Sequence, residues 1–139
     1  MAEHQVEPHV FIILGATGDL TRRKLLPALY HLRDQGILES RNTLIVGAAK
    51  PEMGEEEFRR WAIEGLQQAG WPNESELRVW CEECLYYQPL HEGGMQDYGA
   101  LAMYLRRLEH AHNMPENRVF YLALPPDVVP IAMERLDQV

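Results

Sequence analysis

The stretch Val10-Phe-Ile-Ile-Leu14-Gly15-Ala-Thr-Gly18-Asp19-Leu20 decides the fold of this 139-residue chain. Its apolar run, ended by a glycine, is typical of a strand buried on both faces of a parallel sheet. The two glycines permit a tight turn and a close approach to the backbone. A helix is expected to follow, with Asp19 as its N-cap. Its free N–H groups and the positive end of its dipole would favour a nucleotide phosphate at the turn.

The glycine spacing alone leaves other interpretations open. It reads G-x-x-G and not G-x-G-x-x-G, with Thr21 where a third glycine is expected, and no G-K-[ST] of a P-loop follows. An ordinary strand-to-helix turn is therefore one alternative. For Thr17 the two interpretations are a phosphate-binding residue and a simple turn residue.

Strand and helix patterns alternate along the rest of the chain. The apolar patterns predict further strands at 43–48, 85–88 and 119–124. They predict helices at about 20–35, 55–69, 74–80 and 96–112, and a last helix with Asp127 as its N-cap. This order predicts an α/β fold, a Rossmann-like doubly wound parallel sheet of strand order 3-2-1-4 with helices on both faces. The ligand is then expected at the carboxyl ends of strands one and four.

Several local expectations accompany this fold. Residues 1–9 are expected to form a flexible leader and residues 10–139 a dinucleotide-binding domain. The first helix is expected to bend at Pro27, which lacks an N–H, and to end at Gly36. The pairs Glu55–Arg59 and Glu56–Arg60 have the i,i+4 spacing of ion pairs on the solvent-exposed face of their helix. The opposite face is expected to carry an apolar stripe that ends at Ala69.

Charge and composition exclude several kinds of partner. The net charge is −8, which disfavours nucleic acid and anionic membranes. No apolar run approaches the ~18 residues that span a bilayer, and the acidic start lacks the apolar segment of a signal peptide. A cytoplasmic protein is expected. Cys81 and Cys84 lack the further ligands of a zinc site and are interpreted as reduced cysteines at a helix-to-strand junction, in preference to a redox pair.

Three segments together resemble glucose-6-phosphate dehydrogenases. Residues 15–20 with Arg23-Lys24 resemble the opening signature of the family, residues 46–50 the end of its second strand, and residues 117–126 its fourth strand and the loop that follows. The resemblance covers essentially the whole chain but only the first quarter to third of such an enzyme, so a fragment or truncated product is expected. It implies NADP-dependent oxidation of glucose 6-phosphate to 6-phosphogluconolactone in the pentose phosphate pathway, by an enzyme that is a homo-oligomer.

The end of the second predicted strand favours NADP on physical grounds. An NAD-binding domain places an acid there for the ribose hydroxyls, whereas this strand ends Gly47-Ala48-Ala49-Lys50. A 2′-phosphate meets no repulsion there and can pair with Lys50. Lysine keeps the charge of the arginine that the family commonly has at this position but lacks its bidentate fork, and Glu52 follows closely, so a weaker NADP preference than usual is expected. A solvated lysine is the alternative.

The resemblance and the predicted sheet edge define one set of site residues. The predicted coenzyme-binding residues are Gly15, Ala16, Thr17, Gly18, Asp19, Leu20, Lys50, Ala123, Leu124 and Pro125. By resemblance Lys24 reaches the sugar substrate and the nicotinamide end, with a surface lysine as the alternative. Arg118, at the opposite edge, is assigned a structural role.

No catalytic residue and no metal ligand is predicted in this chain. By resemblance the catalytic histidine of the family lies further along than the chain extends, and hydride transfer needs a base to take the hydroxyl proton. The chain alone is therefore expected to bind NADP, weakly, without turnover. A non-catalytic nucleotide-binding or assembly module and another NADP-dependent reductase are the alternatives.

Overall fold

One parallel sheet forms the centre of the computed structural model, which describes residues 6–137 and 139. Its strands are β1 (His9–Leu14), β2 (Thr43–Ala49), β3 (Leu85–Pro89) and β4 (Arg118–Leu122), in the order β3-β2-β1-β4. All neighbouring strands pair in parallel. The predicted fold class and strand order are confirmed. The first five residues of the expected leader 1–9 lie outside the described residues.

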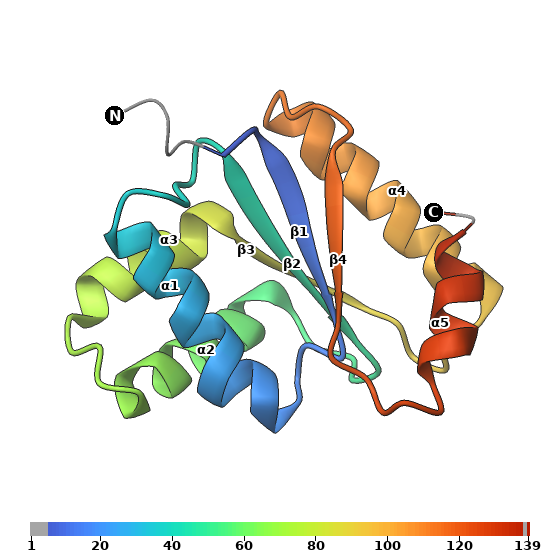
Figure 1. Cartoon of the computed structure of the whole chain (residues 1–139), viewed down its shortest axis with the longest axis horizontal. Helices are drawn as coiled ribbons and strands as arrows, with labels where there is room; N and C mark the ends of the chain where they lie inside the picture. Colours follow the sequence, from blue (N-terminus) through green and yellow to red (C-terminus); the bar gives the residue numbers. More distant parts are fainter. Residues whose placement is uncertain (1–5, 138) are drawn as a thin grey trace.

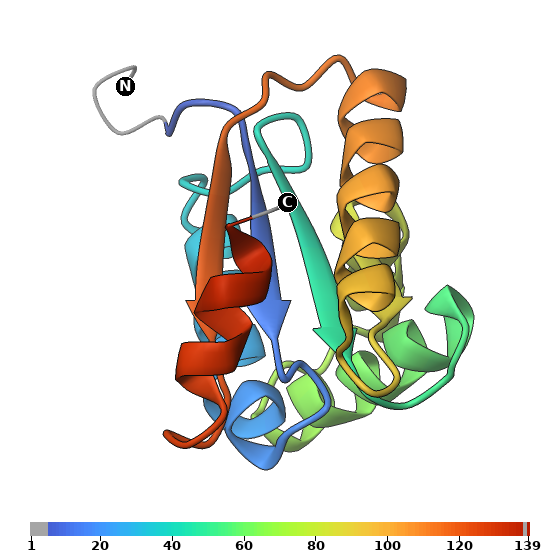
Figure 2. The ribbon, with the colours of Figure 1, turned by 90° about the vertical axis from the view of Figure 1, so that its right-hand side faces the viewer.

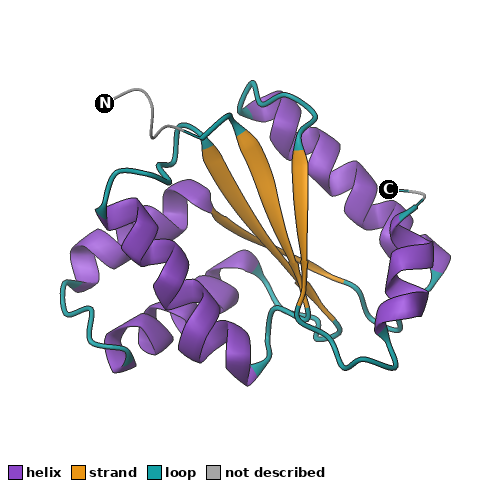
Figure 3. Cartoon of the chain, in the orientation of Figure 1, coloured by secondary structure: helices purple, strands orange, loops and turns teal. Residues whose placement is uncertain are grey.

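Helices cover both faces of the sheet (Figures 1 and 3). The segments η2 (Thr21–Leu25), α1 (Leu26–Asp34), α2 (Glu55–Gln68) and α3 (Glu74–Cys84) lie on one side, and α4 (Met95–Ala111) and α5 (Val129–Leu136) lie on the other. Every residue of β2 is buried as a result. Within the described residues, no helix combines the length and the hydropathy that a membrane crossing needs.

The outer strand β4 is less covered than its neighbour β1. Val119 and Tyr121 are 43% and 38% exposed, and the Tyr121 ring lies 6.2 Å from the ring of Phe11 on β1. The predicted strand 119–124 is too long, because β4 ends at Leu122. The N–H of Ala123 still donates to the carbonyl of Leu14 on β1. Pro125 and Pro126 come shortly after, and because they have no N–H groups the pairing stops.

The first predicted helix is divided in two. It begins with the π-helical turn η2, in which the N–H of Leu26 donates to the carbonyl of Thr21, and α1 continues with Pro27 in its first turn. Proline cannot donate the bond that would continue a regular α-helix at this point. Gly36, with φ +78°, follows the helix end as predicted.

Several predicted helix details are wrong. Asp19 does not cap its helix; its carboxylate accepts a hydrogen bond from Arg23 at 3.1 Å. The N-cap position of α5 is Val128, without a side-chain cap, and not Asp127, because the turn that precedes α5 closes with the Val128 N–H on Pro125. Ala69, expected in the apolar stripe, is exposed just beyond α2.

The predicted ion pairs of α2 are also wrong, because Arg59 turns towards the sheet. Its Nε donates to the carbonyl of Leu85 at 2.8 Å, and its Nη1 pairs with Glu56 at 3.1 Å. The guanidinium also lies over the Tyr86 ring at 5.1 Å. Arg59 therefore fastens α2 to the beginning of β3, which i,i+4 spacing within one helix does not indicate.

Candidate functional site at the carboxyl edge of the sheet

The carboxyl ends of β1, β2 and β4 meet at one edge of the sheet, where the arrowheads of these strands lie in Figure 2. Gly15 N–H donates to the carbonyl of Ala48 at 2.8 Å, and Ala123 N–H donates to the carbonyl of Leu14 at 2.8 Å. The turn after β1 therefore lies between the ends of β2 and β4. The structure brings together three of the predicted segments, 15–20, Lys50 and 123–125.

Gly15 is the position at which the turn admits no side chain. It has φ +85°, and a Cβ built there would lie 2.2 Å from the carbonyl oxygen of Ala123. Both the left-handed backbone and the close approach to β4 require glycine. Gly15 therefore fixes the turn against the end of β4.

The turn has fewer available N–H groups than its glycines suggest. The amides of Gly15 and Ala16 both donate to the Ala48 carbonyl, and the amide of Gly18 donates to the Gly15 carbonyl. Within the described residues the amide of Thr17 has no backbone acceptor. The N–H groups that suit an anion are thus that of Thr17 and the first ones of the exposed helix start, at Asp19 and Leu20.

The two lysines of the chain, Lys24 and Lys50, are exposed, and neither has a carboxylate within ion-pair distance among residues 6–137 and 139. The neighbouring arginines are engaged instead. Arg22 donates to the Trp61 carbonyl at 3.3 Å and lies 5.4 Å from the centre of its ring, and Arg23 pairs with Asp19. Lys24 follows the turn on η2 and makes no described polar contact with the other predicted site residues.

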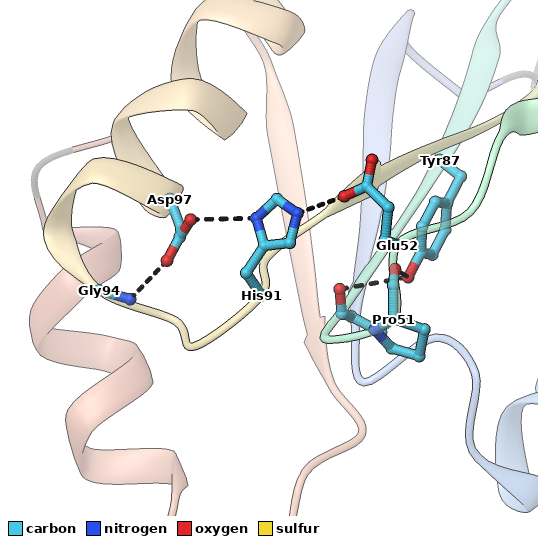
Figure 4. Close-up of polar contacts among 7 residues, drawn as sticks. Pro51, Glu52, Tyr87, His91, Gly94 and Asp97 are labelled. Atoms are coloured by element: carbon cyan, nitrogen blue, oxygen red, sulfur yellow. Dashed lines mark hydrogen bonds and ion pairs between the residues drawn. The ribbon is translucent and has the colours of Figure 1, made fainter.

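The backbone that carries Lys50 is anchored by β3. The Tyr87 hydroxyl lies 2.7 Å from the Pro51 carbonyl (Figure 4) and 3.2 Å from the Ala49 carbonyl. The Leu90 N–H donates to the Ala49 carbonyl at 2.6 Å. Burial, with the nearby acids Glu52 and Glu57, raises the pKa of Tyr87 to about 12, so the hydroxyl remains a donor. The sequence indicated a strand here but gave no sign of this contact.

A histidine links the Lys50 loop to the start of α4. His91, at φ +49°, directs Nε2 to the Glu52 carboxylate and Nδ1 to Asp97 at 3.3 Å (Figure 4). Hydrogen bonds to Glu52 and, to a smaller extent, to Asp97 raise the pKa of His91. The pKa of Asp97 is lowered, mainly by the hydrogen bond from the Gly94 N–H and to a smaller extent by His91. Glu52 is far in the sequence from the other two residues of this triad, His91 and Asp97, and the sequence carries no signal for the triad beyond the presence of Glu52 near Lys50.

The two cysteines lie away from this edge, in the interior. Cys84 ends α3, directly before β3, and its thiol donates to the Trp80 carbonyl at 3.1 Å. Both cysteines are free and buried, as predicted for a helix-to-strand junction. Burial raises the pKa of Cys81 to about 12 and also raises that of Cys84. Thiols held in this state are poor nucleophiles.

Known proteins are similar to this chain in sequence and in fold. Residues 12–139 match the family model described as "Glucose-6-phosphate dehydrogenase, NAD binding domain". A glucose-6-phosphate 1-dehydrogenase of Chlamydia muridarum is 38% identical over 122 residues, with 86% of this chain and 24% of the relative covered. The same-named enzyme of Chlamydia pneumoniae is 37% identical, with 94% and 26% covered. The chain thus spans about a quarter of the length of these relatives.

A solved structure shows the same fold and family. It is described as glucose-6-phosphate dehydrogenase in complex with its substrate glucose-6-phosphate, and it aligns with a TM-score of 0.81 and 27% identity over 95% of this chain and 27% of its own. The structure of the Mycobacterium avium enzyme, with a TM-score of 0.78 and 23% identity over 94% of this chain and 27% of its own, supports the fold alone. The chain belongs to the glucose-6-phosphate dehydrogenase family and forms its amino-terminal dinucleotide-binding domain.

Proposed function

We propose that this chain is the coenzyme-binding part of an NADP-dependent glucose-6-phosphate dehydrogenase. The parent enzyme oxidises glucose 6-phosphate to 6-phosphogluconolactone, the entry to the pentose phosphate pathway. The observation that carries the coenzyme choice is Lys50. It is exposed at the end of β2, on the edge that also holds the Gly15 turn, and the strand ends without a carboxylate.

The coenzyme phosphates are assigned to two places on this edge. The pyrophosphate is held by the Thr17 amide and hydroxyl and by the first N–H groups of the helical segment, with Gly15, Ala16 and Gly18 forming the turn. The 2′-phosphate is held by Lys50, which has no competing ion pair in the described part of the chain. Ala123, Leu124 and Pro125 border the riboside from the β4 side. When bound, NADP supplies the hydride acceptor for the oxidised sugar carbon.

The sugar phosphate is assigned to Lys24. Its ammonium is exposed and has no described carboxylate partner, so it is available to an anionic, polyhydroxylated substrate. The solved relative is a complex of that enzyme with glucose 6-phosphate, its substrate. The catalytic base is assigned to the part of the parent enzyme that this chain does not cover, so this chain alone binds coenzyme without turnover.

The parent enzyme is proposed to act in the cytoplasm as a homo-oligomer. A relative from Solanum tuberosum, 33% identical over 122 residues, is named as a cytoplasmic isoform. The net charge of −8 supports neither nucleic acid nor an anionic membrane as a partner.

A chimera tests the proposed reaction. The chain replaces the matching quarter of the Chlamydia muridarum enzyme, and NADPH formation is followed with and without glucose 6-phosphate. We expect reduction that depends on the sugar phosphate, and a Lys24→Met chimera with a strongly raised KM for the sugar but a nearly unchanged KM for NADP⁺. The unaltered relative is the control.

Two results would contradict the proposal. A folded chimera that binds NADP⁺ without sugar-dependent reduction would favour a non-catalytic nucleotide-binding module. Reduction that is equally fast with sugars that lack a phosphate would favour another reductase.

A further inference from the structure

The loop after β2 carries a negative charge close to its lysine. Glu52 follows Lys50 by two residues, and its side chain is 75% exposed. Tyr87 and Leu90 anchor the backbone on both sides of Lys50 through the carbonyls of Ala49 and Pro51, so the backbone that carries Glu52 stays next to Lys50. Left unpaired, the Glu52 carboxylate would lower the local affinity for a phosphate dianion.

The contacts of His91 determine whether the Glu52 carboxylate is paired with a positive charge. A neutral imidazole has one N–H and can donate to one carboxylate only, whereas both ring nitrogens of His91 face carboxylates, those of Glu52 and Asp97. The geometry therefore corresponds to the imidazolium. His91 is held in place because Leu90, its neighbour, donates to Ala49 at 2.6 Å.

We propose that His91 is a positioning residue for coenzyme specificity, whose imidazolium draws the Glu52 carboxylate to itself so that Lys50 meets the 2′-phosphate with less opposing charge. This inference rests on the proposed function and adds the residue that regulates its phosphate site. With His91 charged, the triad of His91, Glu52 and Asp97 carries one net negative charge; with His91 neutral it carries two.

The charged groups around His91 give the direction of the pH effect. Glu52 faces it from the β2–α2 loop and Asp97 from α4, and Glu92 adjoins it on its own loop. Glu52 and Asp97 pair with His91 and favour the imidazolium. The Tyr87 hydroxyl, whose carbonyl partner Pro51 adjoins Glu52, stays protonated over the same range. Loss of the His91 proton at higher pH therefore weakens binding of NADP⁺, whereas NAD⁺, which has no 2′-phosphate, is unaffected.

The test is calorimetric titration of this chain with NADP⁺ and NAD⁺. At about pH 6.5 we expect His91→Gln to weaken NADP⁺ binding about fivefold, as for a partly screened charge pair, and to leave NAD⁺ unchanged. The double variant His91→Gln/Glu52→Gln is expected to recover the lost affinity. His112→Gln, which removes another exposed histidine and its contact with Tyr86, is the matched control without effect on either coenzyme.

A pH series separates the triad from the coenzyme's own titration. The 2′-phosphate itself titrates near pH 6, so the informative quantity is the affinity of the unaltered chain relative to Glu52→Gln. We expect this ratio to fall as the pH rises above the ordinary pKa of histidine, about 6.5, and His91 loses its proton.

Two further outcomes would overturn the inference. Equal NADP⁺ affinity of the unaltered chain and His91→Gln, or an equal loss for both coenzymes, would overturn it while the proposed function stands. Absence of NADP⁺ binding by the unaltered chain would overturn both.

Discussion

The Tyr87 hydroxyl donates to the Pro51 carbonyl at 2.7 Å and lies 3.2 Å from the Ala49 carbonyl, so one side chain of β3 contacts the backbone on both sides of Lys50. Tyr87 itself is 3% exposed. The position of the exposed lysine is therefore set by a buried residue of the neighbouring strand.

Replacing Tyr87 by Phe should remove this anchor and keep the packing of the ring. We expect the free energy of unfolding to fall by about 1 kcal/mol, because the Pro51 carbonyl loses its donor. Urea denaturation measures this. Tyr86→Phe is the matched control, since its hydroxyl makes only exposed contacts at 3.4 Å and 3.3 Å, and it should change stability by less than about 0.5 kcal/mol. Equal effects of the two variants would contradict the anchoring role.

Gly15→Ala should destabilise the chain through two separate effects. Its φ of +85° disfavours alanine, and the added Cβ would lie 2.2 Å from the Ala123 carbonyl oxygen. Gly36→Ala isolates the first effect, because Gly36 has φ +78° and an added Cβ would meet nothing within 4 Å. We expect about 1 kcal/mol of destabilisation for Gly36→Ala and at least about 2 kcal/mol more for Gly15→Ala. Thermal unfolding of the two variants compares them, and similar values would show that the turn relaxes away from β4.

The pair of Arg118 and Glu109 should contribute strongly to stability. Two nitrogens of the guanidinium lie 2.8 Å from the two carboxylate oxygens, and the side chains are only 8% and 7% exposed. Glu109→Gln removes the buried charge partner of the guanidinium, leaving it only the exposed carboxylate of Glu116 at 3.7 Å, and should lower the free energy of unfolding by about 3 kcal/mol.

An exposed pair provides the control for this prediction. Arg41 and Glu39 pair at 2.5 Å with side chains 68% and 38% exposed, so Glu39→Gln should change stability by less than about 1 kcal/mol. Chemical denaturation of both variants gives the comparison. A loss as small for Glu109→Gln as for Glu39→Gln would contradict the structural role of Arg118.

The contribution of His91 to stability should depend on pH. The contacts with Glu52 and Asp97 raise the pKa of His91 in the folded chain above its ordinary value of 6.5. This contribution is complete below the unfolded pKa and is lost as the pH rises through the raised folded pKa. The urea midpoint of the unaltered chain should thus exceed that of His91→Gln most below about pH 6.5, and the two should converge at alkaline pH.

The opposite pH dependence would contradict this account. The pKa of Asp97 is lowered in the folded chain, so Asp97 affects stability in a different pH range. Its contribution to stability is present above the ordinary pKa of 3.8 and is lost only as the pH falls through the lowered pKa. A midpoint difference that grows towards alkaline pH would mean that His91 binds its neighbours as the neutral imidazole.

The sheet could be predicted from the sequence because its signals are local. The apolar run before Gly15 and the run 43–48 are each bounded by turn residues, and their burial on both faces follows from the alternation of strands with helices. The same strand order predicted that the candidate site lies at the carboxyl edge of the sheet. The reduced cysteines and the structural role of Arg118 were also predicted correctly.

Several side-chain contacts could not be predicted, because a side chain often has more than one partner within reach and the sequence does not show which one it takes. Arg59 was expected to pair with Glu55 and instead pairs with Glu56 and reaches Leu85. Asp19 was expected to cap its helix and instead pairs with Arg23. In both cases a second partner competes for a side chain that a local rule had assigned. The link between Glu52 and His91 crosses two loops and has no local pattern at all.

Calorimetric titration of the chain with NADP⁺ and NAD⁺, before and after Lys50→Gln, tests the central claim most directly. The variant retains a long polar side chain and removes the charge. We expect tighter binding of NADP⁺ than of NAD⁺ by the unaltered chain, and an affinity for NADP⁺ that falls about tenfold in the variant while that for NAD⁺ stays the same. Equal affinities for the two coenzymes, unchanged by Lys50→Gln, would contradict the assignment of the 2′-phosphate to Lys50.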